Sequence, residues 1–355
     1  MGACHVISHE GVSRTHFDRA EMERLHDAGR FFWVDLEQPD AEDFAILRDV
    51  FQFHPLALED SEHFGQRAKL DEYGDYVFLV VYGASPDEDR LVEVHCFYSE
   101  RFLITIHRDD CPAFSELRAR YAKREAPLDD PPRLLYRIVS ALVDSFFPTL
   151  ADLDDRIDEL EDAILQRPTD QQLGQLFDMK RALIAMRKVV TPQRDMFASL
   201  LSGTGALPGM TPDAERHFRD LYDHLIRISD LVDSYRDLMS GVLDTHLSTV
   251  SNRLNVVMKQ LTIIATIFLP LSVLTGFFGQ NFAWMVTRIT GLPVFLAAGI
   301  GLPAAVVIAL VVVFRRRGWL SADGTVPPAR PARRPRLPRQ ERWHQLHPLQ
   351  GPRSP

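Results

Sequence analysis

An amide and a hydroxyl lie at helical spacing along an otherwise apolar segment, and together they could guide a polar solute. Asn255 stands at one end of this segment and Ser272 near the other. Residues three or four positions apart share one side of a helix. A side that faced only lipid would need neither group, so this face predicts the wall of a pore. Its members are Asn255, Met258, Leu261, Ala265, Leu269, Ser272 and Gly276.

The segment that carries this face is long enough to cross a membrane. The 28 residues between Lys259 and Arg288 contain no charged side chain, and a helix needs ~20 apolar residues to cross a bilayer. A second uncharged run, 289–314, ends at three consecutive arginines, 315–317. Basic residues flank the outer ends of both runs, which predicts that both ends face the cytoplasm. We expect two spans, 259–281 and 292–314, joined by an outer loop, 282–291.

Around the first span the chain resembles a known family. The residues VMKQLTIIATIFLPLSVLTGFFGQNF, 257–282, resemble the pore helix and signature loop of the CorA group of divalent-cation channels, which includes a ZntB-like branch. The resemblance covers roughly residues 31–320 and includes HPLALED at 54–60. The signature of that group is usually Gly-Met-Asn. Here Gly279 and Asn281 are kept, whereas Gln280 replaces the methionine.

The resemblance implies a homopentamer with a selectivity ring at the outer mouth of the pore. Gly279, Gln280 and Asn281 would form that ring, which would pass Mg²⁺ and also Co²⁺. Mg²⁺ sheds its waters reluctantly, so neutral amide and backbone oxygens can hold the hydrated ion through its outer shell. Asn255 could form a similar ring at the inner end.

The resemblance also implies that cytoplasmic Mg²⁺ closes the pore when it binds between subunits. Asp244 matches a family aspartate of such a site, and Asp87 and Asp220 match other carboxylates of those sites. Transport would be passive, and Mg²⁺ would be both the transported and the regulatory ion, with no other cofactor.

Composition supports a cytoplasmic, cation-collecting body. Residues 315–355 hold ten of the 40 basic and two of the 49 acidic residues, which leaves 30 basic and 47 acidic residues in 1–314. An acidic body argues against nucleic acid as a partner and suits a domain that collects cations. Cys4, Cys96 and Cys111 form no Cys-x-x-Cys pair, as expected in a reducing cytoplasm. No cleavable signal peptide is expected in the first 30 residues.

The chain order predicts an N-terminal α/β domain and a long helical stalk. Residues 1–30 are expected to be loosely ordered; strands are expected at 31–36 and 76–82, a hairpin at 92–98 and 102–107, and a short helix at 40–51. A break at 126–132 marks the boundary of the domain. One long helix is predicted over 134–166, a second over 171–197 and, after a turn at 202–212, a third that runs from residue 213 into the membrane.

The expected fold is therefore α+β with membrane helices, arranged as a pentameric funnel. Its parts are an α/β cytoplasmic domain (1–130), a helical hairpin and stalk (131–258), the pore helix (259–281), the outer loop (282–291), the second span (292–314) and a basic disordered tail (315–355). We expect a multi-pass inner-membrane protein with both termini in the cytoplasm, in contact with lipid, divalent cations and copies of itself.

The sequence leaves other functions open. A ZntB-like Zn²⁺ transporter coupled to protons is the alternative, because the outer loop has Arg288 and no carboxylate, which does not favour attracting a dication. A membrane-tethered enzyme would need a phosphate-binding glycine loop or a nucleophile with its base, and neither occurs in the first 130 residues. A scaffold and a simple two-helix anchor also remain. His5, His9 and His16 could be read as a Zn²⁺ site, but they are better explained as scattered surface residues.

Overall fold

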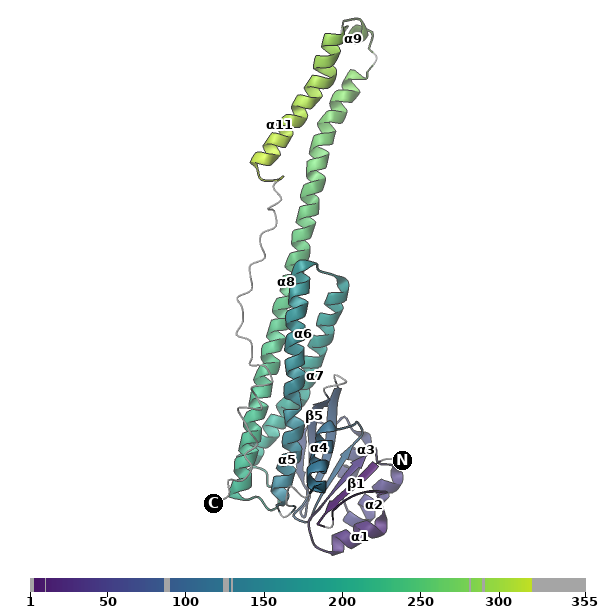
Figure 1. Ribbon diagram of the computed structural model, residues 1–355, viewed down its shortest axis with the longest axis vertical. Coiled ribbons are helices and arrows are strands. Elements are labelled where there is room, and N and C mark those ends of the chain that lie inside the picture. Colours follow the sequence, from purple (N-terminus) through teal and green to yellow (C-terminus); the bar gives the residue numbers. More distant parts are fainter. Residues whose placement is uncertain are drawn as a thin grey trace. The chain divides into compact units, whose positions relative to one another are not determined.

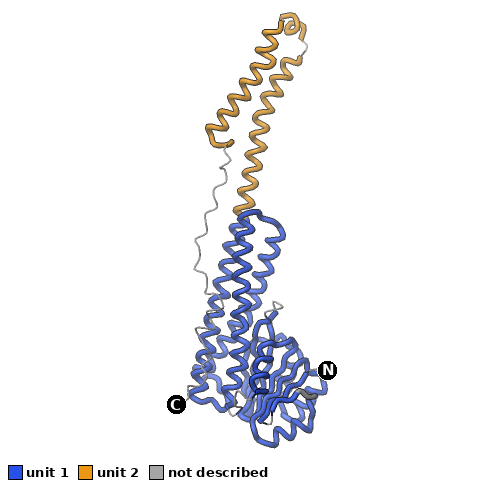
Figure 2. Tube along the Cα trace, viewed as in Figure 1, with its two compact units in different colours: residues 1–246 blue, residues 247–355 orange. Residues whose placement is uncertain are grey.

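The computed structural model describes residues 3–9, 11–85, 90–123, 128, 130–280, 282–288 and 291–320. The chain divides into two compact units, residues 1–246 and residues 247–355 (Figure 2). Asn281, Asp87, part of the break predicted at 126–132 and the predicted disordered tail from 321 lie outside the described residues.

A seven-stranded sheet forms the centre of the first unit (Figure 1). Its order is β2-β1-β3-β7-β6-β5-β4, and all neighbouring strands are antiparallel except β3 and β7. The strands predicted near 31–36 and 76–82 and the hairpin at 92–107 are confirmed. The strands are β1 (Ala3–Ser8), β2 (Gly11–Thr15), β3 (Phe32–Glu37), β4 (Lys69–Glu72), β5 (Val77–Ser85), β6 (Arg90–Tyr98) and β7 (Phe102–His107).

Helices cover both faces of this sheet. Adjacent residues of a strand point to opposite faces, and Phe32 contacts Phe51 of α2 (ring centroids 6.4 Å apart), whereas Trp33 contacts Phe114 of α4 (6.0 Å). The helix predicted at 40–51 is confirmed, and Asp40 caps it with a capping box. The helices of this part are α1 (Arg19–Asp27), α2 (Ala41–Phe51), α3 (Pro55–His63), α4 (Pro112–Ala122) and α5 (Pro131–Asp144).

The prediction that residues 1–30 are loosely ordered is wrong. They form β1, β2 and α1, with Cys4 and Val6 of β1 and Met22 of α1 buried. The segment is short and polar, but β1 pairs along its length with β3, which is distant in sequence. Its order therefore comes from tertiary pairing that local composition does not reveal.

The single helix predicted over 134–166 is two helices, α5 and α6 (Phe146–Gln166), separated at Ser145. Pro148 lies four residues after Asp144 and has no N–H to donate to the Asp144 carbonyl, which weakens the helix at this point. The Ser145 hydroxyl instead donates to the Leu142 carbonyl (2.5 Å) and accepts the Ala84 amide of β5 (2.7 Å).

The break at Ser145 lets the helices approach β5 closely. A Cβ atom added to Gly83 would lie 2.9 Å from both the Leu142 carbonyl oxygen and the Ser145 hydroxyl, so only glycine fits there. Beside it, the buried amide of Gln193 accepts from the Tyr82 N–H (2.6 Å) and donates to the Tyr82 carbonyl (3.3 Å). Gln193 belongs to α7 (Asp170–Leu201), the helix predicted over 171–197.

A single helix, α8 (Pro212–Phe278), follows, as predicted. The Thr211 hydroxyl accepts the Ala214 amide (3.1 Å) and caps its start. In the first unit α8 buries one stripe against the other helices. Val232 and Met239 belong to this stripe, whereas their neighbours Leu231 and Leu238 are only half-buried. The other buried members include Leu221, Leu225, Ile228, Tyr235 and Val242.

The described residues of the second unit are helical. The outer loop predicted at 282–291 contains a short helix, α9 (Ala283–Arg288), and the predicted second span consists of α10 (Leu292–Val294), a π-helical segment η1 (Phe295–Gly301) and α11 (Leu302–Arg316). Pro303 cannot donate to the Gly299 carbonyl, which favours this local widening of the helix. Neither α9 nor η1 was predicted from the sequence.

A buried charge network that sequence reasoning missed lies on the parallel pair β3 and β7. Asp35 is fully buried; it accepts a hydrogen bond from the Thr105 hydroxyl (2.7 Å) and pairs with Arg118 of α4. His107 places Nδ1 2.7 Å from the Asp109 carbonyl oxygen and Nε2 3.2 Å from Asp35 Oδ1. Both ring nitrogens lie within 3.2 Å of an oxygen atom, and the nearby Asp35 carboxylate favours the imidazolium form. In the sequence, the aspartate within the otherwise apolar start of the run FFWVDLE could have indicated a buried charge that needs a partner.

This network predicts a pH-dependent stability of the first unit. Burial opposes the charged form of His107, but the bond to Asp35 and its charge outweigh burial and raise the pKa of His107. Because the pKa of His107 is higher in the folded than in the unfolded protein, its protonation stabilises the folded state. This stabilisation is complete below the unfolded pKa, about 6.5, and is lost as the pH rises through the folded pKa. His107→Gln should therefore lower the melting temperature of the full-length protein in detergent more at about pH 6 than at about pH 9.

The matched control is His16→Gln, which changes an exposed histidine of the same unit. It should leave the melting temperature unchanged at both pH values. An equal loss for His107→Gln at both pH values would mean that His107 contributes packing rather than charge.

Candidate ion pathway

The face predicted to line a pore is exposed along the second-unit part of α8. Met258 and Leu261 are each 61% exposed and Leu269 is 68% exposed. Asn255, Ala265, Ser272 and Gly276 are exposed as well. Side chains of this size exposed in a row on one helix require a covering partner, which is lipid or another copy of the helix.

A different stripe of α8 is partly covered within the chain. Its half-buried members recur at helical spacing, and at ~100° per residue they centre on the side of the helix almost opposite Met258, Leu261 and Leu269. The members are Lys259, Ile263, Thr266, Ile267, Pro270, Leu271, Leu274 and Phe278. Lys259 Nζ lies 3.5 Å from the Gly318 carbonyl oxygen just after α11. The predicted pore face is therefore the open side of α8, and the stripe almost opposite it is the side that is partly covered within the chain.

Three threonines of the first span differ from the two polar residues of the predicted pore face. Thr262, Thr266 and Thr275 each donate to the carbonyl one turn earlier, at 2.8, 2.7 and 2.9 Å, so their hydroxyls are satisfied within the helix. Within the described part of the chain, the side chains of Asn255 and Ser272 make no such bond. The two polar groups on the predicted pore face are thus the ones left to bind water or an ion.

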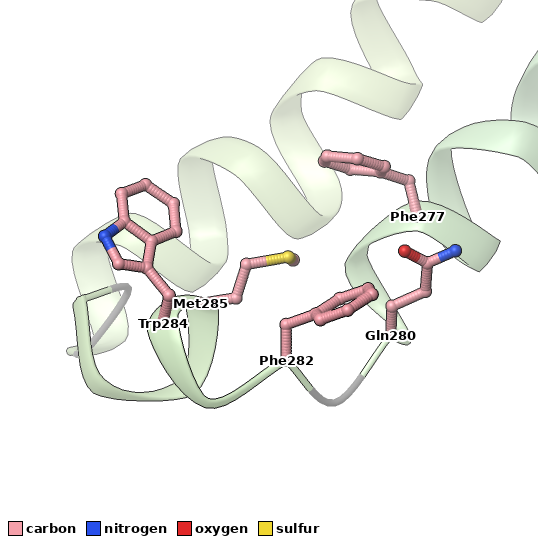
Figure 3. A pocket seen from close by; sticks show the side chains of 5 residues that line it. All are labelled: Phe277, Gln280, Phe282, Trp284 and Met285. Carbon is pink, nitrogen blue, oxygen red and sulfur yellow. The ribbon is translucent and has the colours of Figure 1, made fainter.

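The outer end of α8 leads directly into the signature residues. The helix ends at Phe278, and the amides of Gly279 and Gln280 donate to the carbonyls of Thr275 (2.9 Å) and Phe277 (3.3 Å). Gln280 is exposed beside an apolar pocket of about 370 Å³ that Phe277, Phe282, Trp284 and Met285 also line (Figure 3). Asn281 lies outside the described residues, so its role stays a prediction.

The carboxylates predicted to bind regulatory ions are not brought together in one chain. Asp244 and Asp220 are both exposed on α8, 24 residues apart, which corresponds to ~36 Å along the helix. Asp220 accepts from the Tyr136 hydroxyl of α5 (3.4 Å). One turn later His224 contacts Asp144 (2.9 Å), and this bond raises the pKa of His224. Asp87, the third predicted carboxylate, lies outside the described residues.

No group of three or more His, Cys, Asp or Glu side chains able to hold a metal ion occurs among the described residues. His5 on β1 faces Arg118, and His16 is exposed after β2. Asp244 alone offers one carboxylate, and Mg²⁺ commonly combines one or two carboxylates with several waters. An exposed Asp244 fits a site of that kind only when a second molecule supplies further ligands.

In the part of the chain that the structure describes, three helical stretches are long and apolar enough to cross a membrane by length and composition, one of them the stretch Pro131–Gln166. Half of its most apolar window is buried inside the first unit, which explains its composition as core packing. The other two, Pro212–Phe278 and Leu292–Arg316, have no buried residue in that window. They contain the two predicted spans.

The CorA-like Mg²⁺ transporter protein family matches residues 28–316. A Bacillus subtilis (strain 168) protein named as a metal ion transporter, YfjQ, is 34% identical over 292 residues, 82% of this chain and 90% of its own length. The cobalt/magnesium transport protein CorA of Thermotoga maritima is 36% identical over 284 residues, 77% of this chain and 78% of its own length. A zinc transport protein ZntB of Pectobacterium atrosepticum is 30% identical over a shorter region, 56% of this chain and 59% of its own length.

Among solved structures, the complete CorA magnesium transporter of Methanocaldococcus jannaschii has a similar fold. The TM-score is 0.75 with 22% sequence identity, and the match covers 90% of this chain and 99% of that one. A match of this extent spans both the α/β unit and the apolar C-terminal helices. The family match across residues 28–316, with the relatives at 34% and 36% identity, shows that the chain is a member of the CorA-like Mg²⁺ transporter family.

Proposed function

We propose that the protein is a homopentameric channel of the inner membrane that passes Mg²⁺, and also Co²⁺, into the cytoplasm, where both of its termini lie. The observation that carries this proposal is the division of α8 into two opposite sides. One side is partly covered within the chain, and the other holds Asn255, Ser272 and the exposed apolar residues between them. Two spans cannot enclose an aqueous path, so several copies of α8 must meet on the open side. The family supports five.

The composition of the path suits a hydrated dication. No Asp or Glu occurs between Asp244 and Asp323, so the whole path offers neutral oxygens. Such oxygens replace or contact an ion's hydration shell, whereas a carboxylate ring would hold a dication too strongly for rapid release. The membrane potential supplies the drive, about 2.3 kcal/mol per charge per 100 mV and thus about 4.6 kcal/mol for Mg²⁺.

Asp244 is proposed to sense cytoplasmic Mg²⁺. It lies eleven residues before Asn255, almost three whole helical turns, so it shares the side of α8 on which the copies would meet. A dication held there by carboxylates from neighbouring copies would stabilise the state in which they are close. A ligand stabilises only the state to which it binds better, so bound Mg²⁺ would favour one arrangement, the closed one.

A second function, Zn²⁺ transport coupled to protons, is favoured by two residues at the outer mouth. Gln280 replaces the usual methionine of the family signature, and Arg288 stands where a dication would approach. The 30% identical zinc transport relative points the same way, but over a shorter part of the chain than the CorA relatives.

Flux into sealed vesicles decides between these functions. With the purified protein reconstituted, Mg²⁺ and Co²⁺ should enter along an imposed potential, and a pH gradient should not change the rate. Faster Zn²⁺ entry that follows the proton gradient would replace the first proposal by the second. If none of the three ions enters, both transport functions are excluded and the protein is a scaffold or a membrane anchor.

Asn281→Ala should reduce Mg²⁺ flux by at least tenfold and leave the oligomer assembled, because the outer amides contact the ion and contribute little packing. Sedimentation of the detergent-solubilised protein checks the assembly. The control is Gln260→Ala, which removes an exposed side-chain amide from the side of α8 away from the predicted pore face and should conduct normally. Normal flux through Asn281→Ala would place the filter elsewhere.

Asp244→Asn should shift the closure of the channel to higher cytoplasmic Mg²⁺ without reducing maximal flux, because only the closed state loses a ligand. Protection of the full-length protein from a protease, titrated with Mg²⁺, measures this midpoint. Asp158→Asn removes an exposed carboxylate from α6 instead and should leave the midpoint unchanged. Identical midpoints for Asp244→Asn and the parent would make Asp244 a surface residue only.

A further inference from the structure

Arg288 is the single charged residue among residues 260–314, which include both spans and their outer connection. It is the last residue of α9 and is exposed. The connection contains no carboxylate that could pair with it, and none occurs anywhere between Asp244 and Asp323. The countercharge of this guanidinium must therefore come from outside this part of the chain.

The length of α8 places α9 at the outer surface of the hydrocarbon layer. From Gln260, the first residue after Lys259, to the end of α8 at Phe278 there are 19 residues. A helix of this length spans ~28 Å, close to the ~30 Å thickness of the hydrocarbon core. With Lys259 at the inner boundary, Phe282 to Arg288 lie in the layer that contains lipid glycerol and phosphate groups.

The side chains of α9 suit that layer. Phe282, Trp284 and Val286 are 63%, 70% and 59% exposed, which is unfavourable in water. The side chains of Phe277, Phe282 and Met285 converge on the apolar pocket, and Trp284 closes its far side (Figure 3). Tryptophan is enriched at this depth of membranes because its ring is apolar and its N–H is polar.

Trp284 and Arg288 are four residues apart and so share one side of α9. A guanidinium presents a planar set of donors that binds phosphate bidentately. Another copy of the same segment is a poor partner, because it would bring a second Arg288 and no carboxylate. A phospholipid offers both the apolar contact and the negative charge that this side lacks.

We propose that α9 lies in the outer interfacial layer of the membrane, where Trp284 packs against the upper acyl region of a phospholipid and Arg288 binds its phosphate, with a preference for anionic headgroups. The lipid phosphate then offsets the one positive charge at the outer mouth. This assignment rests on membrane insertion of the two spans and not on which ion is transported.

The test measures quenching of Trp284 fluorescence by lipids brominated in the upper acyl chain. The full-length protein is reconstituted in vesicles, and the spectrum of Trp284→Phe is subtracted to remove the signals of Trp33, Trp319 and Trp343. Brominated phosphatidylglycerol should associate up to about fivefold better than brominated phosphatidylcholine, the effect of about one cationic residue near an anionic surface. Arg288→Gln should abolish this preference while both lipids still quench.

The control is Arg316→Gln, which removes an exposed arginine from the opposite end of the second span and should keep the preference. Quenching by aqueous iodide but not by lipid would place α9 in water and overturn the proposal. Quenching by neither agent would mean that another copy covers Trp284, which also overturns it. A headgroup preference that survives in Arg288→Gln would show that Arg288 does not bind the phosphate.

Discussion

The hydrogen bonds that cover the backbone of β5 fix how the helices of the first unit meet its sheet. β4 pairs with β5 only as far as Val80, so the next backbone groups on that edge need other partners. An unpaired buried N–H or C=O costs about 1–3 kcal/mol. Gln193 of α7 satisfies Tyr82, and Ser145 between α5 and α6 satisfies Ala84. Since α8 packs on these same helices, a movement of α8 against the sheet must break these bonds or carry the helical hairpin with it.

The continuity of α8 joins two different environments along one helix. Within the first unit the buried stripe of α8 includes Phe218, whose ring stacks on Phe197 of α7 with centroids 6.0 Å apart. Farther along, the side that holds Asp244 and Asn255 is exposed in the single chain. Helices of this length gain their stability from packing rather than from propensity. The exposed side therefore needs a covering partner. If that partner is other copies of the helix, as proposed, the same contact would create both the pore and an inter-subunit place for an ion.

Periodicity and turn chemistry were sufficient for most elements. The turn at 202–212 predicted the start of α8, and the uncharged runs predicted the two spans. Features that depend on distant partners were not predictable: β1 is ordered by pairing with β3, and the helix predicted over 134–166 breaks where Ser145 meets Ala84. For the pathway, sequence supplied the face of α8, but only the structure placed the partly covered stripe opposite it. The roles of Asn281, Asp87 and Asp244 stay predictions, because they depend on contacts between chains.

The distribution of charge along the second unit explains why the outer connection differs from the inner ends. Arg253, Lys259 and Arg315–Arg317 flank the spans on one side, and this excess of basic residues predicts an orientation with that side in the cytoplasm. Arg288 opposes this bias from the other side and has no carboxylate near it in sequence. A charge in that position is tolerated most easily where an external anion neutralises it. The length of α8 places α9 at the depth of the lipid phosphate groups, which are such anions. Without lipid, Arg288 would repel dications from the outer mouth of the pore. With its charge neutralised by a lipid phosphate, it would have little effect on them.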